Sequence, residues 1–336
     1  MTFLFLTKLS KFIGFITGIL LLILCSFSSV LFGLTDISWE MIVHAYTSFD
    51  GSNEHIIIKS SRVPRALIAI AVGASSGIAG ALMQALSRNP LAAPDIFGLN
   101  AGASFFIVFS VSFFAITALS SFVWIAFLGA GLSALIIYLL GSMGSNGLTP
   151  MKLTLAGASM AALFSSLSKG ILTLNERALE EVLFWLAGSV EGRKLEMLFP
   201  VMPYMLFGWV AAFFMAKQVN TFTMGEDVAK GLGQRTVWVK AFTWLIIVLL
   251  AGSSVAVAGP IGFIGIVIPH LARALVGVDH RWIIPYSGVL GAILLLLADI
   301  GARFIIMPKE VPVGVMTALI GTPFFIYIAR KGISKS

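Results

Sequence analysis

Long apolar stretches separated by short polar or Gly- and Pro-containing segments occupy most of the chain. A helix needs about 20 apolar residues to cross a hydrocarbon core about 30 Å thick, because each residue rises about 1.5 Å. Ten stretches fit this requirement, at positions 12–34, 63–86, 99–118, 121–141, 152–174, 200–219, 238–258, 261–278, 282–305 and 312–330. The pattern predicts an all-α polytopic membrane protein with about ten transmembrane helices, in a single transmembrane domain spanning residues 1–336.

The composition agrees with this prediction. Of the 336 residues, 58% are hydrophobic and 11% are charged, and the mean hydropathy is +1.00, which excludes a water-soluble globular protein. The basic residues behind the net charge of +7 are scattered between apolar stretches. They therefore indicate a chain that contacts membrane lipid and does not bind nucleic acid. The first stretch is too long for a signal peptide and is expected to be retained. The single cysteine, Cys25, permits no intramolecular disulfide bond.

The distribution of charge predicts the orientation. With the N-terminus inside, the cytoplasmic segments hold thirteen Lys and Arg residues and four acidic ones, whereas the outer segments hold eight basic and ten acidic residues. Cytoplasmic loops of membrane proteins carry an excess of Lys and Arg. Both termini are therefore expected in the cytoplasm.

Few ionisable residues lie inside the predicted helices. Lys169 and Asp299 are well inside, and Arg303, one helical turn from Asp299, is its expected partner. An ion-coupled secondary transporter would need such groups near the midplane, so this class remains an alternative with two possible anchors. The chain contains no phosphate-binding loop, metalloprotease motif or nucleophile elbow. We therefore expect neither ATP hydrolysis, nor another enzymatic activity, nor a cofactor on this chain.

Two polar segments flank the second predicted helix. Ser61–Arg65 precedes it on the outer side, where Arg62 and Arg65 suit a docking protein that presents carboxylates, with binding to lipid headgroups as the alternative. Ser87–Gly98 follows it on the inner side, and its two prolines forbid a continuous helix. A rigid non-helical elbow is expected there.

The longest internal polar segment, Asn220–Arg235, has the pattern of a short helix. Its start is acidic, its stops are glycines, and its apolar positions Val228, Ala229 and Leu232 predict a face that contacts a cytosolic partner or, alternatively, lipid. On the outer side, a short helix at about 178–190 is expected to lie across the mouth of the bundle.

Several motifs together resemble the FecCD/BtuC family of ABC-importer permeases. They are Arg62-Val-Pro-Arg65, Gly80-Ala-Leu-Met-Gln-Ala85, Asn89-Pro-Leu-Ala-Ala-Pro94, Leu155-Ala-Gly157, Gly225-Glu-Asp-Val-Ala229, Gly259-Pro-Ile-Gly-Phe-Ile-Gly265, Pro269-His270 and Pro312-Val-Gly-Val-Met-Thr317. The resemblance implies a BtuC-like type II ABC importer permease in the bacterial cell (inner) membrane. It also implies a second permease subunit, identical or different, two cytosolic ABC ATPase subunits and an extracytoplasmic siderophore-binding protein as partners.

The resemblance also implies roles for particular residues. It assigns docking of the binding protein to Arg62, Arg65 and Arg303. It assigns ATPase coupling to helices at about 222–235, with Gly225, Glu226, Asp227, Val228, Ala229, Gly231, Leu232 and Gly233. The cytoplasmic gate is assigned to Asn89, Leu91, Thr149, Pro150 and Met151, where Pro150 and Met151 replace the small hydroxyl residues of the cobalamin transporter.

The family transports ferric siderophores, haem and cobalamin. Siderophore systems are the most numerous, so the expected function is the translocation pathway for ferric siderophore uptake, with haem or cobalamin import as the alternative. The four histidines, His44, His55, His270 and His280, are separated by sequence and by the expected side of the membrane, so no metal site is expected. That favours passage of a whole chelate.

Overall fold

The computed structural model describes residues 4–33, 35–144 and 147–333. Within these ranges every regular element is a helix, and the only β-type pairing is one isolated bridge between Ile306 and Lys309. The all-α prediction is confirmed.

Ten of the helices lie at the ten predicted stretches. They are α1 (Lys8–Leu31), α4 (Val63–Ser87), α5 (Leu99–Phe114), α6 (Leu119–Ser142), α7 (Pro150–Leu174), α10 (Met202–Thr223), α12 (Thr236–Ala258), α13 (Ile264–Val276), α14 (His280–Phe304) and α15 (Val313–Ile333). Among the described residues, six helices are long and apolar enough to cross a membrane, namely α1, α4 with its N-terminal extension, α6, α7, α12 and α14. The chain is therefore a multi-pass membrane protein.

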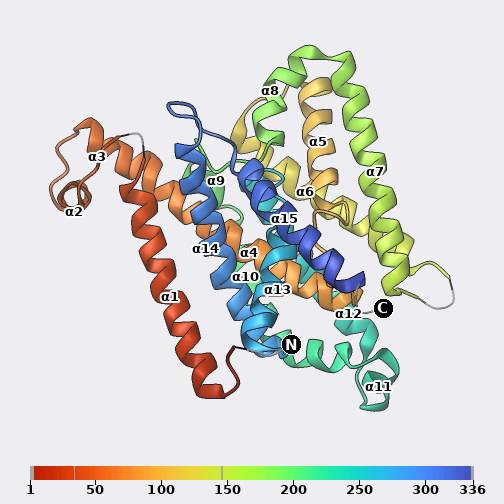
Figure 1. The fold of residues 1–336 in the computed structure, drawn as a ribbon. Helices are drawn as coiled ribbons and strands as arrows, with labels where there is room; N and C mark the ends of the chain where they lie inside the picture. Colours follow the sequence, from red (N-terminus) through yellow and green to blue (C-terminus); the bar gives the residue numbers. More distant parts are fainter. Residues whose placement is uncertain (1–3, 34, 145–146, 334–336) are drawn as a thin grey trace.

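Short helices lie at the two ends of the bundle. On one end, α2 (Trp39–Thr47), α3 (Asn53–Ile57) and a π-helical turn (Ile58–Arg62) lead into α4, and α8 (Glu176–Leu186) and α9 (Leu195–Leu198) follow α7. At the other end α11 (Glu226–Gly231) connects α10 with α12. Figure 1 shows α8 and α11 at opposite ends of the molecule. Helix α8 and helix α11 thus lie in the two polar segments for which the sequence predicts short helices.

Helix α4 forms the centre of the bundle and packs against α12, α13 and α14. Small residues allow these backbones to approach closely, because a Cβ on Gly80 would lie 2.2 Å from the carbonyl oxygen of Gly265, and one on Gly73 would lie 2.4 Å from that of Gly291. Such small-residue contacts are the usual means of packing helices in lipid. They fix α4 against α13 and α14.

The predicted elbow between α4 and α5 is non-helical. Arg88 ends α4 in a left-handed conformation with φ of 50°, and Gly98 begins α5 with φ of 83°. Between them, a carboxylate oxygen of Asp95 accepts a hydrogen bond from the backbone N–H of Phe263, at 3.3 Å. Phe263 belongs to the break between α12 and α13. The two interruptions of helical structure therefore contact each other inside the bundle, where protein groups satisfy their backbone.

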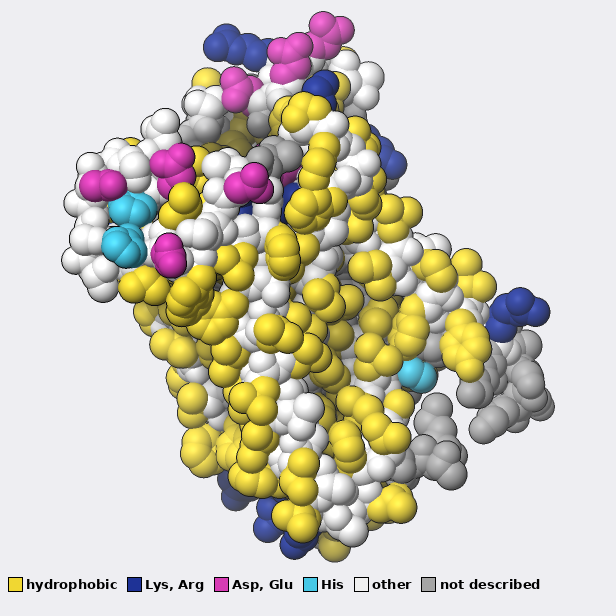
Figure 2. All heavy atoms as spheres, turned by 60° about the vertical axis from the view of Figure 1, so that its left-hand side comes forward, with side chains coloured by type: hydrophobic (Ala, Val, Ile, Leu, Met, Phe, Trp, Pro, Cys, Tyr) yellow, Lys and Arg dark blue, Asp and Glu magenta, His cyan; other side chains and the backbone are white. Residues whose placement is uncertain are grey.

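The surface separates into three zones. On the face drawn in Figure 2, a broad hydrophobic band lies between an end rich in Asp and Glu, over α2, α3 and α8, and an end with a group of Lys and Arg side chains. This arrangement is typical of a protein whose apolar band contacts lipid and whose two ends contact water.

Candidate functional site

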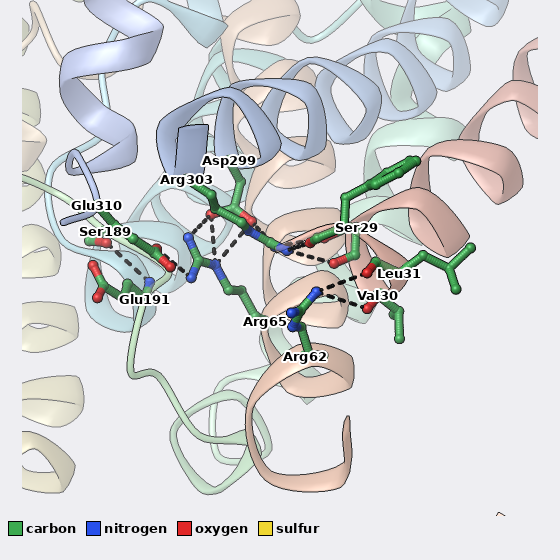
Figure 3. A network of polar contacts seen from close by, with 11 residues as sticks. Ser29, Val30, Leu31, Arg62, Arg65, Ser189, Glu191, Asp299, Arg303 and Glu310 are labelled. Atoms are coloured by element: carbon green, nitrogen blue, oxygen red, sulfur yellow. Dashed lines mark hydrogen bonds and ion pairs between the residues drawn. The ribbon is translucent and has the colours of Figure 1, made fainter. Parts of the chain in front are cut away.

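Three arginines predicted to act together do lie together, at the end of the bundle that carries α2, α3 and α8. Arg62 and Arg65 come from the start of α4, and Arg303 comes from the last turn of α14 (Figure 3). Their partners come from α1, from α14 and from the segment between α14 and α15. We call this set of residues the arginine network.

Asp299 is the carboxylate at the centre of the arginine network and is fully buried. Nε and Nη2 of Arg65 donate to its Oδ1 at 2.9 and 2.7 Å. Arg303, one turn further along α14, donates to the other oxygen of the same carboxylate, as the spacing of the two residues predicted. Arg65 also forms an ion pair with Glu310, with Nη1 and Oε2 separated by 2.6 Å. One arginine thus joins α4, α14 and the segment that precedes α15.

Two guanidinium groups cap the C-terminus of α1. Nη1 of Arg62 donates to the carbonyl oxygens of Val30 and Leu31 at 3.1 and 3.2 Å. Nη1 of Arg303 donates to the carbonyl of Ser29 at 2.6 Å. The last carbonyls of a helix lack intrahelical partners and lie at the negative end of its dipole, so a cation there is stabilising. Both arginines therefore hold α1 against the bundle.

The three arginines that were expected to dock the binding protein are buried. The relative exposure is 6% for Arg62, 6% for Arg65 and 2% for Arg303, and all three are bound within the chain. A docking protein could bind their guanidinium groups only by replacing internal partners such as Glu310. The sequence did not identify Glu310, or Asp299 as the partner of Arg65, because only tertiary packing brings these residues together.

The segment between α8 and α9 places a further acid beside the arginine network. Glu191 lies near Glu310 (Figure 3), and its pKa is raised, first by burial and second by the negative charge of Glu310. Arg193, 6% exposed, donates from Nε to the carbonyl of Ser189 at 3.2 Å. Burial lowers the pKa of Arg193 to about 10. Glu191 and Glu310 thus place two carboxyl groups beside the buried arginines.

At the opposite end, α11 is fixed to α12 by charge. Oε2 of Glu226 lies 2.8 Å from Nζ of Lys240, which also donates to the carbonyl oxygen of Leu148 at 2.8 Å. Oε1 of Glu226 lies 3.2 Å from Nζ of Lys230. Burial raises the pKa of Glu226, but hydrogen bonds from the two lysines outweigh this effect and lower it overall. The predicted coupling segment is therefore held in place by α12 and by the segment before α7.

The apolar face of α11 differs from the expected one at one position. Ala229 is completely buried inside the chain, whereas Val228 and Leu232 are 50% and 68% exposed. Met224, just before the helix, is 69% exposed. Ala229 therefore cannot contact a partner, and the exposed apolar surface consists of Met224, Val228 and Leu232. Of the other predicted coupling residues, Gly225 begins the helix with φ of 133°.

The remaining coupling and gate residues are placed as follows. Asp227 lies in the first turn of α11, Gly231 ends the helix, and Gly233 follows it with φ of 79°. The side chain of Asn89 accepts a hydrogen bond from the N–H of Leu91 at 2.9 Å, which forms a turn in the elbow. Thr149 caps α7, Pro150 is its first residue, and Met151 is 82% exposed. No hydrogen bond or ion pair joins these two turns in the described part of the chain.

No group of three or more His, Cys, Asp or Glu side chains that could hold a metal ion is found among the described residues.

Known proteins and a known family match this chain over almost its whole length. Residues 20–331 match the model of the FecCD transport family. The chain is 58% identical to the "Probable siderophore transport system permease protein YfiZ" of Bacillus subtilis (strain 168), over 96% of this chain and 97% of that protein. It is 43% identical to the Fe(3+)-citrate import system permease protein YfmD of the same organism, over 96% of each chain. A solved structure, "An inward-facing conformation of a putative metal-chelate type ABC transporter", superposes with a TM-score of 0.83 at 28% identity, covering 94% of this chain and 98% of that one.

Proposed function

The chain belongs to the FecCD transport family, and from this premise we propose that it is the permease subunit of an ATP-driven importer and forms the pathway for ferric siderophores. The match to iron-chelate permeases over nearly the full length of both proteins carries the proposal. The multi-pass helical fold supports it. A permease needs no catalytic groups of its own, because ATP is hydrolysed on separate subunits.

The surface of α11 supports the ATPase part of the proposal. Three large apolar side chains, those of Met224, Val228 and Leu232, are exposed at the end of the bundle where Lys and Arg gather. A short helix with an exposed apolar face suits a groove on a protein partner. We propose that this face lies in the cytoplasm and seats on the ATPase, while the ion pair between Glu226 and Lys240 transmits the force to α12.

The opposite end is proposed to receive an extracytoplasmic binding protein. Carboxylates of that protein would compete with Glu310 for Arg65, since bidentate arginine–carboxylate pairs are strong and directional. Because the arginines also stabilise the fold, the test needs two readouts. Arg65→Lys should weaken binding-protein affinity measurably while the thermal stability of the isolated permease changes less than in Arg65→Glu. Unchanged affinity in both variants would contradict docking at this residue.

Uptake measurements in which ATP and the proton gradient are removed separately test the main proposal. Cells that express the chain from its own locus, and cells that lack it, are given ⁵⁵Fe bound to siderophores of several chemical classes. Uptake should disappear in the deletion strain, and in the wild type it should disappear when ATP is depleted with the proton gradient held. Uptake that persists without ATP but stops when the gradient is collapsed would favour an ion-coupled transporter. Uptake of haem or cobalamin, and not of ferric siderophores, would assign another substrate of the same family.

A further inference from the structure

Helix α7 has an exposed surface that differs from that of the other long helices. Only 17% of the most apolar stretch is buried in α7, which is the same share as in α1. The mean hydropathy of these stretches is nevertheless 1.3 in α7 against 2.3 in α1. The two helices lie on opposite edges of the bundle in Figure 1. A surface with the polarity of α1 suits lipid, whereas the equally exposed but more polar surface of α7 suits water.

Four polar residues of α7 and one alanine form a stripe along the helix. Ser159, Ala162, Ser166, Lys169 and Thr173 follow one another at intervals of three and four residues and therefore share one face of the helix. All five are exposed. With about 1.5 Å of rise per residue, Lys169 lies about 7.5 Å, and Ser159 about 22 Å, from the outer end of α7. The stripe therefore reaches from near the outer surface to the middle of the membrane.

Among the described residues, three polar groups of the stripe make no hydrogen bond, whereas the hydroxyl of Thr173 donates to the carbonyl oxygen of Lys169 at 2.8 Å. No hydrogen bond within the described residues is made by the hydroxyls of Ser159 and Ser166, and the ammonium group of Lys169 makes neither a hydrogen bond nor an ion pair there. By contrast, Ser26 of α1 donates to the carbonyl of Leu22 at 2.7 Å. Unpaired polar groups are costly in hydrocarbon and are satisfied in water. The stripe therefore faces water at membrane depth.

Among the described residues, no acidic side chain packed along the span compensates the charge of Lys169. Helix α7 packs mainly on α5 and α6, and neither of these helices contains a charged residue. The nearby acidic residues belong to α8, beyond the outer end of α7. An isolated lysine that faces a water-filled pathway inside a membrane attracts anions, because the surrounding low-dielectric walls focus its field.

Resting on the proposed importer function, we propose that the α7 stripe lines the substrate pathway and that Lys169 contacts the passing chelate, which makes the transporter selective for anionic ferric complexes. A ferric tris-catecholate is a trianion and a ferric tris-hydroxamate is neutral, so the two separate the effect of charge from that of size. Lys169 is a specificity-determining residue in this proposal. The alternative, in which the ammonium group extends to outer lipid headgroups, predicts no dependence of uptake on substrate charge.

Uptake of ⁵⁵Fe as a tris-catecholate and as a tris-hydroxamate, by the complete transporter in cells, tests the selectivity. Lys169→Gln should lower the rate for the anionic chelate roughly tenfold and that for the neutral chelate less than twofold. Lys169→Glu should lower the anionic rate further, and Lys169→Arg should retain it. Lys309→Gln, at an exposed outer lysine outside the stripe, is the matched control and should change neither rate. Equal effects on both chelates, or import of only the neutral chelate by the wild type, would overturn the proposal.

Chemical labelling tests the location of the stripe without transport. In a Cys25→Ser background, Ser166→Cys should react with a charged, membrane-impermeant thiol reagent in right-side-out or inside-out vesicles. Leu167→Cys, exposed on α7 but outside the stripe, should remain unlabelled. Labelling of Leu167→Cys and not of Ser166→Cys would overturn the proposal. Absence of uptake of both chelates in the wild type would contradict the proposed function instead, and the labelling pattern would then decide the placement of the stripe.

Discussion

Arg65 and Asp299 form a buried ion pair across 234 positions of the chain, with Nε and Nη2 of Arg65 at 2.9 and 2.7 Å from Oδ1 of Asp299. The same carboxylate binds Arg303, so a single negative charge is shared between two buried guanidinium groups. Removing one member of such a group leaves charge without a partner in a region of low dielectric constant, and this is far more damaging than losing an exposed pair.

Asp299→Asn tests this relationship. The substitution leaves Arg65 and Arg303 buried with too little negative charge, and we expect a loss of about 3–5 kcal/mol in stability. A large drop in thermal unfolding temperature in detergent should result. Arg281→Gln removes the pair between Arg281 and Asp279, in which the arginine side chain is 66% exposed, and should cause a much smaller drop. Equal drops in the two variants would contradict a structural role for the buried network.

Gly33→Ala tests the capping of α1 without altering an arginine. A Cβ at this position would lie 2.4 Å from Cζ of Arg62, so the guanidinium group must leave the carbonyl oxygens of Val30 and Leu31. The unfolding temperature should fall, and protease cleavage after α1 should become faster. Gly131→Ala is the matched control, because no atom lies within 4 Å of the added Cβ, and it should not destabilise the protein. A Gly33→Ala protein as stable as the wild type would show that the cap is dispensable.

Leu232→Glu and Val228→Glu test the proposed ATPase contact. Each replaces an exposed apolar side chain by a charge that would be desolvated against a partner, so ATPase subunits should co-purify less with the variant and chelate uptake should fall at least tenfold. The permease itself should keep its unfolding temperature, because both side chains are exposed. Val278→Glu changes another exposed valine, 71% exposed and outside α11. If Val278→Glu releases the ATPase and the α11 variants do not, the contact lies elsewhere.

The pH dependence of Asp279 provides a further test. Partial burial raises its pKa, but hydrogen bonds, first from Arg281 and then from Asn220, outweigh this effect and lower the pKa to about 2. A carboxyl whose pKa is depressed by folding stabilises the folded state above its unfolded pKa of about 4, and this contribution is lost as the pH falls toward 2. The difference in unfolding temperature between wild type and Asp279→Asn should therefore be constant from pH 7 to about 5 and shrink below that. A difference in unfolding temperature that grows as the pH falls would contradict the lowered pKa of Asp279.

Single-cysteine labelling tests the orientation. In a Cys25→Ser background, Lys230→Cys on α11 should react with an impermeant reagent only from the cytoplasmic side. Glu40→Cys on α2 should react only from outside. Both positions are exposed. The reverse pattern would invert the topology and, with it, the assignment of α11 to the ATPase.

The sequence by itself determined the positions of the ten helices and of the elbow. The hydrocarbon thickness sets the length of an apolar run, so a helix is visible wherever such a run occurs. Pro90 and Pro94 forbid a helix in the elbow whatever surrounds it. The pair of Asp299 and Arg303 was also predictable, because residues four positions apart always meet on a helix.

Tertiary structure decided what these residues face. Arg62 and Arg65 were expected to face a partner, yet Arg62 binds the end of α1, 32 positions earlier in the chain. Arg65 binds Asp299 and Glu310, each more than 200 positions away, and only packing brings such segments to one place. The apolar pattern of α11 cannot tell that Ala229 faces inward while Leu232 faces outward. Likewise, the spacing of Ser159, Ser166 and Lys169 places them on one side of α7, but only the packing of α5 and α6 on the helix leaves that side exposed. Local spacing defines which residues share a face, and the packing of neighbouring helices decides whether that face contacts protein, lipid or water.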